Sequence, residues 1–544
     1  MLSRPSLAAL VLLFGGCVKP PPTVTAEAGP KPRVLTFLAT SELRGTPEPC
    51  GCQSDPLGDV ARIAALLKQA RLQGGALLVD AGGLLYKSEP IKDAERPQAE
   101  LKAKFLDGEW RELGAVMALG EEDLQGGLPP PGRLCSNATS VDGGPSLGLG
   151  EGVVRDVDGI KVGLFGLLDP ARATDRIKVS SPIAAAAREV AALKQRGAQV
   201  IVALAHLNRV DARRLARSVP GLSIVVVGEV SSEDAGDGAE AELVGETILV
   251  QPAIEGQRVA RVELHLVGDA ISTHLIEGAE ERVRTLDRLR NKLFECDREL
   301  AALANDPSAD PTFVQAQRDH RLDLQRAAES LRAAPIAPPA GPWAIATLVP
   351  IRLVLPRDPV VAEAMKKLDA EAGELNRKAG EKVPVPPADP GDAHFTGDGD
   401  CELCHGKAAL WWKKTVHSKA WNTLVAVNKQ WSFDCIKCHV TGYGQPGGSA
   451  MAHVDKLESV QCEACHGPGS LHVDDPKRAR LRIPKESDCK QCHTKEHSDT
   501  FAFEPYLRDV LGPGHGEQRR AKLGDGPTGH ELRGAAIAKA SGAK

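Results

Sequence analysis

The last quarter of the chain contains the stretch Cys401-Glu402-Leu403-Cys404-His405, and the same Cys-x-x-Cys-His pattern returns at 435–439, 462–466 and 489–493. In this pattern two thiols reach the two vinyl groups of one porphyrin, and the adjoining histidine places its imidazole on the iron. A zinc site would use the cysteines as thiolate pairs, but it gives no reason for a histidine after every pair. The four motifs therefore predict four covalently attached haems.

These haems decide the fold of the region because so little protein surrounds them. We expect the cofactors to form its core and the apoprotein to be largely unfolded. The predicted thioether residues are Cys401, Cys404, Cys435, Cys438, Cys462, Cys465, Cys489 and Cys492, and the predicted proximal iron ligands are His405, His439, His466 and His493. Eight of the 13 cysteines thus fall in one cluster, unlike a disulfide framework spread along a chain.

The same region holds further histidines that can supply the second axial ligand of each iron. The candidates are His394, His417, His453, His472, His497 and His515, and Met451 is the only methionine nearby. Ligation by histidine and methionine can therefore apply to one haem at most, and we expect mainly bis-histidine haems of low potential. Six candidates for four irons leave some histidines as bystanders, and one iron can be five-coordinate.

The residues around the motifs resemble those of the cytochrome c554-type multihaem family. The similar stretches are 411–420 after the first motif, Val440-Thr441-Gly442-Tyr443 after the second, Gly467-Pro468-Gly469-Ser470-Leu471-His472 after the third and Thr494-Lys495-Glu496-His497-Ser498 after the fourth. The resemblance implies a mainly α-helical tetrahaem domain over 399–515. It favours His417 and His472 as distal ligands, then His497 and His453. We expect His417 to reach a neighbouring haem rather than its own.

The N-terminus has the pattern of an export signal. Arg4 precedes an apolar run from Leu7 to Phe14, which is shorter than the about 20 residues that span a bilayer. The sequence Leu13-Phe14-Gly15-Gly16-Cys17 resembles a bacterial lipobox, in which Cys17 becomes the lipidated first residue; the alternative is an ordinary secretory signal. Val18 after the cysteine points to the outer membrane of a Gram-negative-type cell envelope. We expect a signal peptide at 1–17 and an extended, proline-containing tether at 18–32.

From 33 to 278, short apolar runs alternate with helical segments, which is typical of an α/β fold. The order of the segments resembles the four-layer calcineurin-like phosphoesterase fold of periplasmic 5′-nucleotidases. The matching pieces include Thr40-Ser41-Glu42-Leu43-Arg44-Gly45, Leu78-Val79-Asp80-Ala81-Gly82-Gly83 and Ala203-Leu204-Ala205-His206.

The positions that hold two metal ions in that family are altered here. Two-metal hydrolysis needs a bridging carboxylate and several imidazoles around ions roughly 3.5–4 Å apart. Gly83 replaces the bridging aspartate, Arg44 replaces a ligand histidine, and His206 alone remains as a matching imidazole. We therefore expect a domain without hydrolytic activity, in which Glu42, Glu122 and Glu229 could still bind a hard cation such as Ca²⁺ or Mg²⁺.

Three cysteines accompany this altered site. Cys50 and Cys52 are separated by Gly51, shortly after the first metal position, and Cys135 follows later. In one interpretation Cys50 and Cys52 form a redox pair, because two cysteines one residue apart close a strained ring and strained disulfides are labile. They are then the candidate catalytic residues. In the alternative, Cys50 or Cys52 forms a structural disulfide with Cys135.

The segments between the two domains are predicted to be structural. Leu286, Leu289, Leu293, Cys296, Leu300 and Leu303 recur at helical spacing, as do Phe313, His320, Leu324 and Leu331. We expect an antiparallel helical hairpin at 279–335, a strand and a helix within 336–380, a linker at 381–398, and a disordered tail at 516–544.

Composition limits the possible functions. The chain has 544 residues, 42% of them hydrophobic, and a net charge of −5, which argues against nucleic acid as a partner. We expect an envelope lipoprotein that transfers electrons through its haems to redox partner proteins. The alternative is an oxidoreductase of a small nitrogen or sulfur compound, acting at an open haem or at Cys50 and Cys52. A metal-dependent 5′-nucleotidase is a third hypothesis.

Overall fold

The computed structural model describes residues 33–49, 51–127, 129–141, 148–229, 238–268, 270–275, 277–304, 310–333 and 341–541. Several predicted features lie outside the described residues: the signal peptide with Cys17, the tether at 18–32, and Cys50. Within the described ranges, no helix combines the length and the apolar character needed to cross a membrane.

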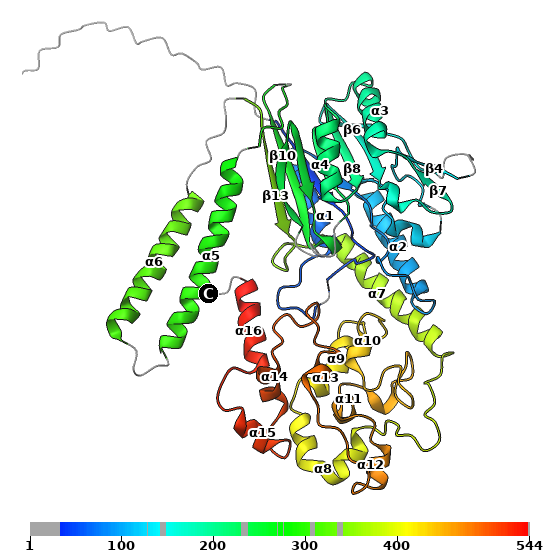
Figure 1. Ribbon diagram of the computed structural model, residues 1–544, viewed down its shortest axis with the longest axis vertical. Helices are drawn as coiled ribbons and strands as arrows, with labels where there is room; N and C mark the ends of the chain where they lie inside the picture. Colours follow the sequence, from blue (N-terminus) through cyan, green and yellow to red (C-terminus); the bar gives the residue numbers. More distant parts are fainter. Residues whose placement is uncertain are drawn as a thin grey trace, which may run out of the picture.

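The N-terminal domain is built on two facing sheets (Figure 1). The first has the order β13 (Trp343–Pro350), β12 (Arg258–Leu266), β1 (Arg33–Thr40), β2 (Gly75–Asp80) and β3 (Val116–Met117). The second has the order β10 (Ala239–Val244), β11 (Thr247–Gln251), β9 (Ile224–Val227), β8 (Val200–His206), β6 (Ile160–Leu168) and β5 (Val153–Val157). A small third sheet pairs β4 (Ala138–Ser140) with β7 (Ile177–Val179).

Helices cover the outer face of each sheet. The packing of α1 (Val60–Gln73), α2 (Arg96–Glu112) and α7 (Pro359–Gly380) buries one apolar cluster against the first sheet. A second cluster lies between the second sheet and the helices α3 (Pro182–Gln195) and α4 (Arg209–Ser218). The largest cluster joins both sheets, with Phe37 and Val202 among its fully buried members. The four layers confirm the predicted α/β class.

Parallel pairing brings several loops to one edge of the two sheets. β1 runs parallel to β2, and β6, β8, β9 and β11 run parallel to one another. Loops after the carboxyl ends of parallel strands gather at a common edge, where α/β folds place their sites. Glu42 follows β1, Gly83 follows β2, and His206 ends β8. Short 3-10 helices lie in other connections: η1 (Glu122–Gly126), η2 (Pro170–Arg172) and η3 (Ile254–Gly256).

The boundary predicted at 278 is wrong, because β13 belongs to the first sheet. β13 pairs antiparallel with β12 from Arg258↔Pro350 to His265↔Trp343. The helical hairpin of α5 (Glu277–Ala304) and α6 (Pro311–Ala333) is thus inserted between two strands that are neighbours in space. Cys296 is buried in the hairpin, where its thiol donates to the carbonyl of Gln317 at 3.4 Å.

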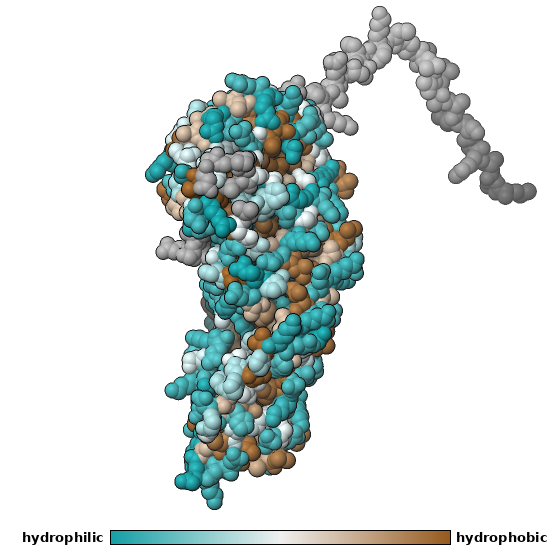
Figure 2. All heavy atoms as spheres, turned by 90° about the vertical axis from the view of Figure 1, so that its right-hand side faces the viewer, coloured by the Kyte–Doolittle hydropathy of each residue, from teal (hydrophilic) through white to brown (hydrophobic). Residues whose placement is uncertain are grey.

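The C-terminal domain consists of short helices joined by irregular chain, at the opposite end of the molecule from the sheets (Figure 1). Its helices are α8 (Asp398–Trp412), η4 (His417–Lys419), α9 (Ala420–Val425), α10 (Ile436–His439), η5 (Asp455–Leu457), α11 (Cys462–His466), α12 (Ser470–Asp474), α13 (Glu486–Cys489), α14 (Phe503–Val510), α15 (Glu517–Lys522) and α16 (Gly529–Ala540). Its apolar cluster is small and centres on Trp421, Ile436, Val440, Met451 and Val454. On the face seen in Figure 2, hydrophobic side chains are interspersed with hydrophilic ones.

The tail predicted to be disordered instead forms α15 and α16, so that expectation is wrong. Thr528 and Glu531 cap α16 reciprocally, which satisfies its first amide groups. Arg508 of α14 donates to the carbonyls of Leu523 and Pro527 at 3.0 and 3.1 Å. The glycine- and alanine-rich composition suggested disorder, but these side-chain contacts and the packing of α16 on α14 order the segment.

The two domains meet through charged contacts. Asp434, which directly precedes Cys435, pairs with Lys87 and Lys102 at 2.7 Å each. Lys429 also pairs with Glu48. These contacts attach the loops after β1 and β2, and helix α2, to the second Cys-x-x-Cys-His motif.

Candidate functional site

Three pairs of imidazoles face one another in the C-terminal domain. The ring centroids of His405 and His472 are 6.3 Å apart, with planes inclined by 17°. Those of His417 and His493 are 6.1 Å apart at 57°. Those of His466 and His515 are 6.1 Å apart at 77°. Each pair joins one motif histidine to a histidine distant in sequence.

This spacing fits an iron held between two axial imidazoles. Two metal–nitrogen bonds of about 2 Å, plus roughly 1 Å from each nitrogen to its ring centre, place two such centroids about 6 Å apart. Direct stacking would bring the rings closer, as His265 and Trp343 show with centroids 3.5 Å apart. The three pairs therefore have the separation that bis-histidine haem ligation needs.

The outer ring nitrogen is already engaged in four of the six paired histidines, and also in His439. The Nδ1 atoms of His439, His466, His472 and His515 lie 2.7–3.0 Å from the carbonyl oxygens of Ala420, Arg482, Ala479 and Val510, respectively, and the Nδ1 atom of His493 lies 3.0 Å from the hydroxyl of Ser498. Metal-binding histidines usually donate the second ring N–H to such a group, which fixes the ring and leaves Nε2 for the metal. The contacts thus prepare Nε2 of each ring as the ligand atom.

The motif cysteines form no disulfides among the described residues, and four of them lie close together in pairs. The thiols of Cys401 and Cys462 are within hydrogen-bonding reach of each other, and so are those of Cys438 and Cys492. The first motif therefore adjoins the third, and the second adjoins the fourth. The eight thiols are available for thioether bonds.

His439 differs from the other motif histidines. Among the described residues, no second imidazole makes a ring contact with it. The candidates His394, His453 and His497 likewise make no ring contact with a motif histidine among the described residues. The backbone N–H of His394 donates to the hydroxyl of Ser470, and His497 Nδ1 lies 2.8 Å from the hydroxyl of Thr494. His453 Nε2 is buried without a hydrogen-bond partner. The family resemblance favours His497 and His453 after His417 and His472, but the histidine that pairs with His466 is His515.

Buried polar contacts hold the paired segments in place. Trp411 and Trp412 donate their indole N–H groups to the carbonyls of Val510 and Val460 at 3.0 and 2.9 Å. Glu463, inside the third motif, is 2% exposed and accepts backbone N–H bonds from Thr396, Gly397 and Gly469. Sequence reasoning missed Glu463, because nothing in a local pattern marks a carboxylate that joins distant loops.

A known family matches part of this domain. The profile of the family described as cytochrome c554 and c-prime covers residues 400–467. The C-terminal domain resembles the cytochromes c554. The matched stretch of this cytochrome domain contains three of the four motifs, and it supports a multihaem c-type cytochrome with covalently bound haem c. The motif at 489–493 lies beyond it.

Known proteins are similar to parts of this chain. Cytochrome c-554 of Nitrosomonas europaea is 37% identical over 110 residues, which are 17% of this chain and 47% of that protein, so the chain spans about half of the curated relative. The structure of a 5′-nucleotidase precursor from Thermus thermophilus is 16% identical and covers 65% of this chain and 61% of its own, with a TM-score of 0.41. A calcineurin-like phosphoesterase from Bacillus subtilis is 19% identical and covers 55% of this chain and 99% of its own, with a TM-score of 0.34.

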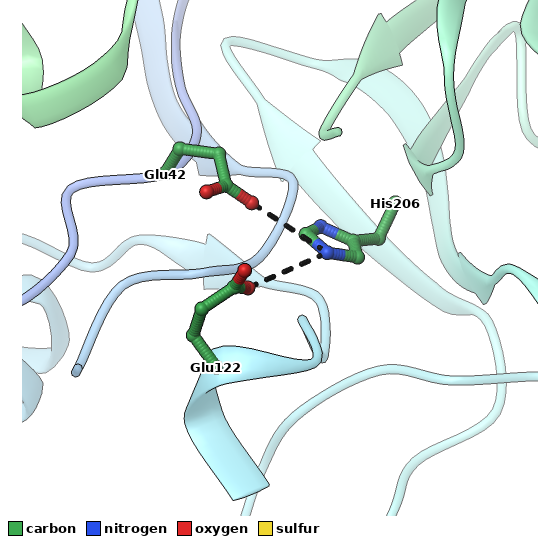
Figure 3. A group of neighbouring side chains, drawn as sticks. All are labelled: Glu42, Glu122 and His206. Carbon is green, nitrogen blue, oxygen red and sulfur yellow. Dashed lines mark ion pairs between the residues drawn. The ribbon is translucent and has the colours of Figure 1, made fainter. Parts of the chain in front are cut away.

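A second cluster lies in the α/β domain, where Glu42, Glu122 and His206 converge (Figure 3). His206 Nε2 is 3.5 Å from Glu42 Oε1 and 3.6 Å from Glu122 Oε2. Burial raises the pKa of Glu42 to about 7. Burial alone would lower the pKa of His206, but the carboxylates of Glu42 and Glu122 outweigh it and raise that pKa.

Glu229 does not join this cluster, contrary to the predicted cation set of Glu42, Glu122 and Glu229. Its carboxylate pairs with Arg172 at 2.7 Å, and the same guanidinium pairs with Glu121 at 2.7 Å. Because Arg172 comes from a loop after β6, nothing near Glu229 along the chain indicates that this arginine holds it.

The two described cysteines of the α/β domain, Cys52 and Cys135, are not joined by a bridge. Cys135 is buried beside Leu119 and Leu168, and burial raises its pKa to about 12. Cys52 lies on a loop whose carbonyls accept bonds from Arg533 of α16. Cys52 and Cys135 are not bonded to each other, so a disulfide of Cys52 with Cys135 is wrong, while Cys50 lies outside the described residues. The same loop contacts the cytochrome domain again where Ser54 N–H donates to Asp499 Oδ1 at 3.0 Å.

Proposed function

We propose that this protein is an electron-transfer cytochrome of the cell envelope, which carries four covalently bound haems and passes electrons to redox partner proteins. The observation that supports it most is the set of three imidazole pairs with centroids 6.1–6.3 Å apart, each including a motif histidine. The export pattern at 1–17 supports the proposal, since an exported chain would reach the compartment where c-type haems are attached. Anchoring through lipid on Cys17 is part of the proposal.

The residues divide the work of holding the cofactors. Cys401 and Cys404 would anchor the first haem, and the equivalent cysteines would anchor the other three. When bound, haem c supplies a one-electron redox centre whose potential depends on its axial ligands and surroundings. Neutral imidazoles on both sides favour low potentials. The carbonyls that engage Nδ1 of His439, His466, His472 and His515 keep these rings in one orientation, so that ligation does not have to order them.

The close approach of motif thiols supports a relay between haems. Because Cys401 adjoins Cys462 and Cys438 adjoins Cys492, the porphyrins attached there would be neighbours in two pairs. Long-range cross-pairing, such as that of His417 with His493, ties separate segments together and fixes their spacing. A fixed spacing is what a chain of electron carriers requires.

His439 supports a second candidate function. A ring with its Nδ1 atom bonded to Ala420 and no second imidazole opposite among the described residues would leave one iron face open to a small ligand. A haem of this kind could reduce or oxidise a small nitrogen or sulfur compound. We therefore keep an oxidoreductase activity as the alternative to simple electron transfer.

Two measurements on the matured protein test the proposal. A pyridine haemochrome assay should give four haems per chain, and a count of two or fewer would contradict it. Electron paramagnetic resonance of the oxidised protein should show three low-spin haems and one high-spin haem. If all haems are low-spin, the open site at His439 and an oxidoreductase reaction at that haem are both excluded, while the relay stands.

A further inference from the structure

The separations within the Glu42 cluster are wrong for hydrogen bonds and right for metal ligands. A good N–H···O bond has a donor–acceptor distance of about 2.7–3.2 Å, whereas His206 Nε2 lies 3.5 and 3.6 Å from its two carboxylate oxygens. A tetrahedral ion with bonds of about 2.1 Å has ligand atoms about 3.4 Å apart. All three ligand atoms lie within 4.8 Å of one another, so one ion can reach them together.

One oxygen of the cluster has no other partner. Glu122 is 9% exposed, and its Oε2 atom is buried without a hydrogen bond, although it points toward His206 (Figure 3). A buried carboxylate oxygen without a partner is costly, and such groups normally pair with a cation or a donor. The ring of His206 is held on the side away from the carboxylates, where its Nδ1 atom lies 3.3 Å from the carbonyl oxygen of Ala81. This outer contact directs Nε2 into the cluster, as at metal sites.

The groups next to the cluster are engaged elsewhere or lack a ligand atom for a second ion. Arg44 donates to Glu42 Oε2 at 2.7 Å, which occupies one oxygen of that carboxylate and leaves Oε1 toward His206. A side chain at Gly83 would place its Cβ atom 2.7 Å from Glu42 Oε1, so the longer Glu42 side chain fills the space that a carboxylate at 83 would need. Glu229 is held away by Arg172.

We propose that Glu42, Glu122 and His206 bind a single divalent transition-metal ion such as Zn²⁺, Mn²⁺ or Fe²⁺. One imidazole with two carboxylates suits these ions better than Ca²⁺, which takes oxygen ligands only. Three protein ligands leave further positions for water or a small anion. The ion joins the loop after β1 to η1 and to the end of β8, and so closes the edge of both sheets.

The test uses the haem-loaded chain, treated with a chelator and then dialysed against Zn²⁺. Elemental analysis should find one zinc per chain in the wild type, beyond the haem iron. Glu122→Gln keeps the size of the side chain but weakens zinc binding at least tenfold. The matched control is Glu121→Gln, which removes the neighbouring carboxylate, partly exposed and paired with Arg172, and should bind zinc like the wild type.

Other histidines could bind zinc nonspecifically, but such binding would be equal in all three proteins. The proposal is overturned if Glu122→Gln retains as much zinc as the wild type at equal affinity, or if the wild type retains none. Haem content and far-ultraviolet circular dichroism establish that each variant is folded. X-ray absorption at the zinc edge of the wild type gives an independent reading: one imidazole among oxygen ligands is expected, and sulfur ligands or several imidazoles would refute the assignment even if a variant failed to fold.

Discussion

Replacing Glu463 by glutamine should destabilise the cytochrome domain and disturb one particular haem pair. The carboxylate accepts three backbone bonds: Thr396 N at 3.0 Å, Gly397 N at 2.8 Å and Gly469 N at 2.7 Å. Glutamine retains one acceptor oxygen but turns an amide N–H group toward a backbone N–H. Hydrogen bonds to charged groups contribute about 1.5–3 kcal/mol each, and those to one group do not add fully, so we expect a loss of about 3 kcal/mol.

Guanidinium unfolding of the haem-loaded protein, followed by circular dichroism of the Soret band, measures this loss. With a slope of about 3 kcal/mol per molar denaturant, the midpoint of the cytochrome transition should fall by about 1 M. Glu458→Gln, an exposed glutamate in the same domain, is the control and should leave the midpoint unchanged. Because Gly469 precedes α12, which carries His472, the variant should also weaken the low-spin signal of the His405 pair. A midpoint no lower than that of Glu458→Gln would refute the reasoning.

Three further predictions follow from other contacts. His417→Ala should convert one haem from low-spin to high-spin with all four still attached, because it removes the partner of His493. The control His497→Ala should leave the low-spin spectrum unchanged. An unchanged low-spin spectrum in His417→Ala would show that His417 is not an axial ligand. Nucleotides should not be hydrolysed with added Mn²⁺, Co²⁺ or Zn²⁺, because Gly83 lacks a bridging carboxylate; turnover abolished by His206→Ala would contradict this. Lys102 and Lys87 hold the pKa of Asp434 far below its usual range, so its stabilising contribution is complete above pH about 4, where the unfolded group is ionised, and is lost as the pH falls below that value. The acid-unfolding midpoint of Asp434→Asn should therefore lie at higher pH than that of the wild type, and identical acid curves would count against the interdomain pairs.

Features that depend only on neighbouring residues along the chain could be predicted from the sequence. The motif at 401–405 is recognised from the spacing of its own residues alone. Short apolar runs separated by helical segments were sufficient to predict the strands β1, β2, β6 and β8. The same holds for the loss of a bridging carboxylate at Gly83. Such features depend on neighbours along the chain, which a single sequence displays.

Contacts between distant residues were less accessible. His515 pairs with His466, although nothing in its surroundings separated it from His497. Glu229 forms an ion pair with Arg172, and β13 pairs with β12 although a long insertion separates the two strands in sequence. In each case the partner is chosen by three-dimensional packing. Several partners were equally plausible along the chain, so residue type alone could not choose among them.

The position of the hairpin α5–α6 makes it separable from the rest of the protein. The insertion begins after β12 and ends before β13, and these two strands are hydrogen-bonded to each other. At the base of the insertion, His265 stacks on Trp343 with ring centroids 3.5 Å apart. Adjacent strands lie about 5 Å apart, which a two-residue turn can bridge. A short turn could therefore replace the hairpin, and a fluorescent reporter or an affinity module could be inserted there, without altering the register of the sheet that supports Glu42.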